Sequence, residues 1–129
     1  MLAVLWAGFI FWNSAQNATV SDGLSDGVIE LLGLHIASFW VRKAAHFSAF
    51  ALLGVLVGLF FAQGRKLRHV PIFSVLFVCL LIACTDETIQ LFPLGRSSEL
   101  RDVWIDFSGA VSGMLLVLVG KHVFKRKNT

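Results

Sequence analysis

The sequence predicts an all-α fold, an integral membrane bundle of about four transmembrane helices with a short interfacial helix. Three observations support this fold class. Hydrophobic residues make up 57% of the 129-residue chain and the mean hydropathy is +0.78, whereas ordinary soluble domains are less apolar. Charged residues make up only 15% of the chain. Long apolar runs alternate with short polar segments that hold most of those charges, so we expect a single transmembrane domain over residues 1–129.

Four apolar segments are candidate membrane spans, at about residues 2–14, 41–62, 71–91 and 102–120. The first is short, because at about 1.5 Å per residue its apolar part covers roughly half of the ~30 Å hydrocarbon core. Its polar end is expected to continue the helix into the headgroups. We do not expect a cleaved signal peptide here, since no basic region precedes the apolar run and no clear cleavage site follows it.

The segment between the first two spans divides into two parts. Residues 13–27 are polar, rich in turn formers and slightly acidic, and they predict a loop. Residues 28–39 are apolar with a few polar interruptions, and they predict a short helix that lies on the membrane surface. His35 belongs to this second part, where we expect a headgroup-facing or packing role rather than a ligand role.

The charge distribution predicts the orientation in the membrane. One side of the membrane receives basic residues and no acidic ones, namely Arg65, Lys66, Arg68, Lys121, Lys125, Arg126 and Lys127. The other side receives all eight acidic residues. Because positively charged loops stay in the cytoplasm, both termini are expected there, and loops 13–40 and 92–101 are expected to face outward. The basic tail is interpreted as an anchor near anionic lipid rather than a nucleic-acid site.

Polar residues near three helix ends gather on the outward side. Ionisable groups at membrane depth are costly and usually face the bundle interior or water, so we expect these side chains to form one shared pocket. Lys43 and His46 are three residues apart and therefore share a face of the second span. The full predicted set is Lys43, His46, Glu87, Gln90, Arg96, Asp102 and Asp106.

Small residues predict which helix faces are packed. Asp106 continues helically to Gly109 and Gly113, a spacing that lets two helices approach closely. Gly54 and Gly58 provide a matching small-residue face on the second span. Asp106 is therefore expected on a packed face, away from lipid.

The same residues also have purely structural interpretations. Asp102 suits the first turn of a helix, where a carboxylate is favourable. Glu87 with Lys43, or Asp102 with Arg96, are candidate structural ion pairs.

A metal is the less favoured interpretation of the cluster. Its histidine and carboxylates, with Asp86 among them, offer nitrogen and oxygen ligands for zinc, magnesium or calcium, but no spacing is a recognised metal motif, so no metal is assigned. Cys79 and Cys84 lie in one apolar run and are expected to be packing residues. No motif in the sequence indicates a particular cofactor.

Several short motifs, taken in their order and spacing, resemble those of a known family. They are Asn13–Gln16, Arg42–Phe47, Asp86–Gln90, Gly95-Arg96, Arg101–Asp106, and Gly109 with Gly113. On these residues almost the whole chain resembles the VanZ-like family of bacterial membrane proteins, named for its teicoplanin-resistance member. The resemblance implies a multi-pass protein of the bacterial cell membrane associated with glycopeptide resistance. It does not indicate a catalysed reaction. The family pattern often has Asn where this chain has Asp106, and a hydrogen-bonding role fits both residues.

Two functions fit the predicted pocket. The first is an enzyme acting on an outward-facing membrane lipid or lipid-linked cell-wall precursor. In that enzyme Lys43, Gln90 and Arg96 would bind the anionic substrate. His46 would be the general acid or base, because imidazole changes charge near neutral pH. The three acidic members of the pocket, Glu87, Asp102 and Asp106, would orient His46 or move protons.

The second function is a non-enzymatic binding or immunity protein that holds the antibiotic or a lipid precursor in the same pocket. A transporter is disfavoured, because the inner halves of the spans carry no ionisable residue. Alternating access usually depends on an internal repeat, and this sequence shows none. A transporter would therefore need a second copy of the chain, as in a dimer, to provide the repeat.

Overall fold

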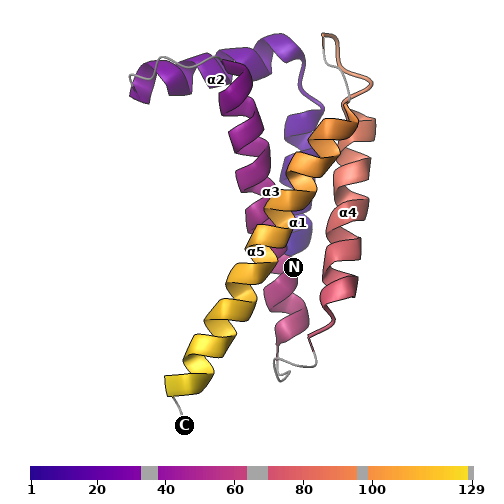
Figure 1. Cartoon of the computed structure of the whole chain (residues 1–129). Helices are drawn as coiled ribbons and strands as arrows, with labels where there is room; N and C mark the ends of the chain where they lie inside the picture. The colour runs from indigo at the N-terminus through magenta and orange to yellow at the C-terminus, as the bar shows by residue number, and fades with distance from the viewer. Residues whose placement is uncertain (33–37, 64–69, 96–98, 128–129) are drawn as a thin grey trace.

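The computed structural model describes residues 1–32, 38–63, 70–95 and 99–127, and these residues form an all-helical bundle. The helices are α1 (Leu2–Ser14), α2 (Ala18–Leu32), α3 (Ser38–Ala62), α4 (Ile72–Ile89) and α5 (Leu100–Lys127). Helices α1, α3, α4 and α5 run along the bundle, and α2 lies across one end of it (Figure 1). The predicted all-α bundle is confirmed.

Three helices are long and apolar enough to cross a membrane: α3 over Phe39–Ala62, α4 over Ile72–Ile89 and α5 over Leu100–Phe124. The bundle exposes many large apolar side chains, such as Phe73 at 91% and Leu116 at 66%. Continuous exposure of this kind is unfavourable in water, whereas hydrocarbon accepts it. The structure therefore supports a membrane bundle, in which α1 is a shorter apolar helix of 13 residues beside three full-length ones.

The predicted loop at residues 13–27 is wrong over most of its length, because α2 already begins at Ala18. Val20, Leu24 and Val28 recur every four residues and give this segment one apolar face, which is a helical period. Its glycines weaken the helix without preventing it. These apolar side chains are exposed, as on a helix that lies on a membrane surface. His35 lies outside the described residues.

The ends of α3 and α5 also differ from the predicted spans. Helix α3 begins at Ser38, and α5 continues to Lys127, seven residues past the predicted end at 120. Lysine and arginine are good helix formers, and their charge is favourable at a helix C-terminus. The ammonium group of Lys121 donates a hydrogen bond to the carbonyl oxygen of Ala62, which satisfies one of the free carbonyls at the end of α3.

The most extensive contact between described helices joins α3 and α5, and glycine makes it possible. A Cβ atom on Gly109 would overlap the carbonyl oxygen of Phe47. One on Gly113 would overlap the carbonyl oxygen of Ala51. On α3, a Cβ on Gly54 would meet the backbone of α5 in the same way. The predicted small-residue faces are confirmed, and the two helix backbones touch directly.

The substitution Gly113→Ala is expected to destabilise the bundle by about 1–3 kcal/mol, because the added methyl group has no space against the α3 backbone. Gly120→Ala is the matched control, since nothing lies within 4 Å of a Cβ built on Gly120 in the same helix. Thermal unfolding in detergent measures both changes. Equal stability of the two variants would contradict the close contact described here.

Candidate functional site

Helices α3 and α5 begin, and α4 ends, at the end of the bundle that α2 crosses (Figure 1). Polar side chains are buried inside the bundle at this end. Asp86 and Asp106 have no exposed surface, and Glu87 and Gln90 are nearly as buried. Buried carboxylates are rare unless other polar groups compensate them. This end of the bundle is therefore chemically distinct from its apolar remainder.

Three helices bring His46, Asp86 and Asp106 together, and we call these residues the histidine–aspartate cluster. The Nδ1 atom of His46 lies 3.3 Å from Asp106 Oδ1 and 3.9 Å from Asp86 Oδ2. The side chain of His46 is 13% exposed. The imidazole therefore faces two buried carboxylates on one side and keeps limited access to the surroundings.

Each member of the cluster extends the buried stripe of its own helix. The stripes are Cys79, Ala83 and Asp86 on α4, continued by Gln90 at its C-cap, and Asp106, Ala110, Met114 and Val117 on α5. On α3 the buried residues Phe50, Leu53 and Val57 follow His46 at helical spacing. The same rotation of each helix that buries its apolar residues thus turns the polar group inward. Asp86 was not among the predicted site residues, although its place in this stripe is the signal that identifies it.

Lys43 forms an ion pair with Asp102 at the edge of the site. Both side chains are mostly buried, and the ammonium group also lies 5.0 Å from the centre of the Phe39 ring. The predicted alternative pairing of Lys43 with Glu87 is wrong, because Lys43 reaches the start of α5 instead. Arg96, the predicted partner of Asp102 and a predicted ligand-binding residue, lies outside the described residues.

Glu87 and Gln90 connect the end of α4 to the start of α5. The Nε2 atom of Gln90 donates hydrogen bonds to Asp86 Oδ2 at 3.1 Å and to Glu87 Oε1 at 3.2 Å. The other oxygen of Glu87 accepts a hydrogen bond from the backbone N–H of Glu99 at 3.1 Å. Gly95 adopts a left-handed φ of 76°, which favours glycine, within the intervening turn. Glu87 thus positions the chain that leads into Asp102 and Asp106.

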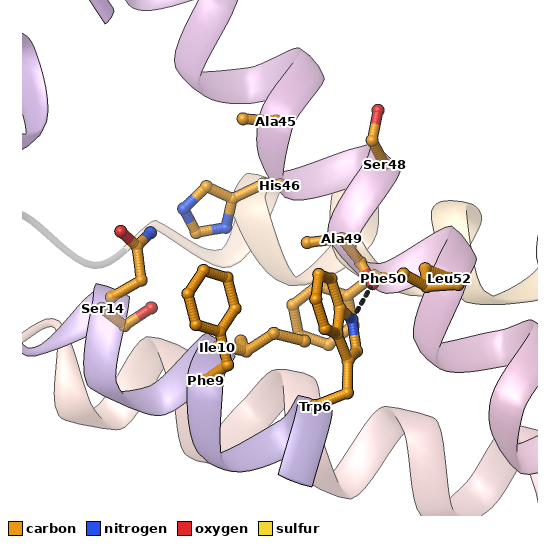
Figure 2. A pocket seen from close by; sticks show the side chains of 11 residues that line it. Trp6, Phe9, Ile10, Ser14, Ala45, His46, Ser48, Ala49, Phe50 and Leu52 are labelled. Atoms are coloured by element: carbon orange, nitrogen blue, oxygen red, sulfur yellow. Dashed lines mark hydrogen bonds between the residues drawn. The ribbon is translucent and has the colours of Figure 1, made fainter. Parts of the chain in front are cut away.

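Two cavities meet at His46. The polar pocket, of about 70 Å³, is lined by Arg42, Lys43, His46, Gln90 and Asp102 among others. The apolar groove, of about 430 Å³, lies between α1 and α3. Figure 2 shows the imidazole of His46 and the side chain of Ser14 at one end of this groove, with the rings of Phe9 and Trp6 along it.

The apolar groove opens on the side of the bundle. Its lining residues Phe9 and Leu52 are 48% and 41% exposed, so the space reaches the surface that hydrocarbon would cover. Trp6 Nε1 donates a hydrogen bond to the carbonyl oxygen of Ala49 at 2.9 Å, which joins α1 to α3 (Figure 2). Sequence reasoning missed this groove, because it depends on how α1 packs against α3.

The predicted site residues, with the exception of Arg96, therefore lie at one end of the bundle. A model of the VanZ/LLP1 family matches residues 1–121, a range that contains all of them. The chain belongs to the VanZ/LLP1 family. Comparisons with curated proteins and with solved structures gave no match. The VanZ/LLP1 assignment agrees with the three membrane-length helices, and the chain is a VanZ-like membrane protein.

The ion pair between Lys43 and Asp102 is expected to show an energetic coupling of about 1 kcal/mol, since both groups are largely shielded from water. A double-mutant cycle of Lys43→Met and Asp102→Asn, measured by thermal unfolding in detergent, gives this value. Strictly additive effects of the two substitutions would contradict the pairing.

Proposed function

We propose that this VanZ/LLP1 protein binds an anionic, lipid-linked molecule of the bacterial cell envelope and thereby contributes to glycopeptide resistance, including resistance to teicoplanin. One observation carries the proposal: an apolar groove and a polar pocket adjoin at His46. A lipid-linked precursor has a hydrocarbon chain and an anionic head, which are the two parts that these neighbouring cavities suit.

The apolar groove has the properties of a site for a hydrocarbon chain. Its volume of about 430 Å³ falls in the range of roughly 300–1,000 Å³ that small-molecule sites occupy. Its walls are mainly apolar, and Ser14 lies toward the His46 end, as Figure 2 shows. A chain that enters from the bilayer past Phe9 and Leu52 would therefore bring its polar end to His46.

The polar pocket supplies groups that recognise an anion. Arg42 and Lys43 provide positive charge, and charged donors form strong hydrogen bonds to phosphate and carboxylate. Gln90 adds an amide, and the ion pair with Asp102 fixes the ammonium group of Lys43 at the edge of the pocket. Arg96 remains a proposed contributor to the same task.

The helix directions support an outward-facing site. The histidine–aspartate cluster lies where α3 and α5 begin and α4 ends, and this end of the bundle is opposite the C-terminal ends of α3 and α5 (Figure 1). The sequence at and after those two C-terminal ends contains the basic residues predicted to stay in the cytoplasm. With both termini cytoplasmic, the site meets the outer leaflet, where cell-wall precursors and glycopeptides are encountered.

The contact between His46 and Asp106 favours a second candidate function, an enzyme that acts on the same ligand. A carboxylate beside an imidazole orients it and supports proton transfer. In that function Glu87 and Asp102 would position the reacting groups. The described lining of the polar pocket contains no Ser, Thr or Cys, and the Asp102 carboxylate is paired with Lys43, so binding alone is the simpler function.

Filling the groove is expected to abolish resistance. Ala45 and Ala44 are neighbouring, exposed residues of α3, but only Ala45 lines the groove. In a teicoplanin-susceptible bacterium that expresses the protein, Ala45→Phe should lower the minimum inhibitory concentration to that of cells without the protein. Ala44→Phe should preserve resistance. Membrane abundance of both variants is measured by immunoblotting, and equal resistance at equal abundance would refute the groove as the binding site.

Native mass spectrometry of the protein in nanodiscs made from bacterial lipid extract separates binding from catalysis. The wild type is expected to retain an anionic lipid-linked molecule with an unchanged mass, and His46→Ala should retain much less of it. A converted lipid that forms with the wild type and not with His46→Ala would establish the enzyme instead. Retention of only bulk phospholipid by both proteins would contradict both functions.

A further inference from the structure

The histidine–aspartate cluster has the composition and spacing of a metal site. His46, Asp86 and Asp106 each offer one ligand atom, and these atoms all lie within 4.8 Å of one another. Ligand atoms at about 2.1 Å from a tetrahedral zinc ion lie ~3.4 Å apart. The distances of 3.3 Å and 3.9 Å from His46 Nδ1 to the two carboxylates are close to this spacing.

The buried carboxylate of Asp106 is an independent sign that a ligand belongs there. Its side chain has no exposed surface, and its Oδ2 atom has no hydrogen-bond donor among the described residues. Burying a carboxylate is unfavourable unless hydrogen bonds or a cation compensate its charge. Asp106 points into the cluster, where its Oδ1 atom faces His46. A cation bound between the three side chains would use the remaining acceptor capacity of Asp106.

We propose that His46, Asp86 and Asp106 bind one divalent transition-metal ion of the zinc type. One imidazole nitrogen and two carboxylate oxygens suit zinc better than calcium or magnesium, which prefer oxygen ligands alone. Three protein ligands leave one position for water or for an anionic ligand group. His46 also lines the polar pocket, so the open position would lie beside that pocket.

Gln90 supports the proposed metal ligands from outside the cluster. Its Nε2 atom donates a hydrogen bond to Asp86 Oδ2 and holds that carboxylate toward His46. Hydrogen bonds of this kind orient metal ligands, and their loss typically weakens metal binding 10- to 100-fold. Gln90 would therefore be a positioning residue of the metal site.

The test is metal binding without any lipid ligand, so that its outcome is separate from the proposed function. Protein purified in detergent and stripped with EDTA is titrated with zinc chloride by isothermal calorimetry, and bound zinc is counted by inductively coupled plasma mass spectrometry. One zinc ion per chain is expected. Asp106→Asn keeps the side-chain shape but removes the charge, and it should weaken binding at least about tenfold. Asp26→Asn, at an exposed acid on α2, should bind zinc as the wild type does.

Cobalt gives a spectroscopic readout of the same site. Cobalt(II) is expected to produce visible absorption bands in the wild type that are lost in His46→Ala, and Gln90→Leu should weaken cobalt binding. Circular dichroism checks that each variant is folded. Absence of a stoichiometric zinc ion in the wild type would overturn the proposal. So would zinc affinity that is unchanged in folded Asp106→Asn, His46→Ala and Gln90→Leu, since the pair of His46 and Asp106 would then be an ion pair without a metal.

Discussion

The direct contact between the backbones of α3 and α5 is the constraint on which the site depends. Gly109 lies three residues after Asp106 and packs against the carbonyl oxygen of Phe47, which follows His46. Because no side chain separates the helices at this point, the imidazole of His46 reaches within 3.3 Å of the Asp106 carboxylate. A larger residue at 109 would move the helices apart and separate the two groups. The packing of the bundle and the chemistry of the site therefore rest on the same small residues.

The polar end of the bundle combines groups that seldom occur together in hydrocarbon. The ion pair of Lys43 with Asp102 lies at its edge, while Asp86 and Asp106 are fully buried beside one imidazole. Such groups are costly at membrane depth, and functional sites are where membrane proteins commonly keep them. The apolar groove brings hydrocarbon to the same imidazole. The proposed amphiphilic ligand at His46 would contact both surroundings, and the proposed cation would compensate the buried carboxylates.

Hydropathy and small-residue spacing predicted the apolar helices and the packed face of Asp106, because both depend on local composition and helical period. The extent of α2 was mispredicted because its glycines and serines suggested turns more strongly than its apolar period suggested a helix. The sequence did not predict which of the neighbouring acids on α4 faces His46. The rotation of α4 about its axis decides this, and it turns Asp86 rather than Glu87 toward the imidazole. The groove next to Phe9 follows from the packing of α1 on α3, which local sequence does not encode.

Photocrosslinking in living bacteria tests directly whether one amphiphilic ligand occupies the groove and reaches His46. A benzophenone amino acid would replace Phe9 in the groove, or Trp104, which is 65% exposed and lines neither cavity. Mass spectrometry would then identify the crosslinked lipids. If the ligand occupies the groove, an anionic lipid-linked envelope molecule is crosslinked at position 9 and is absent at position 104. The same bulk phospholipids at both positions would contradict it.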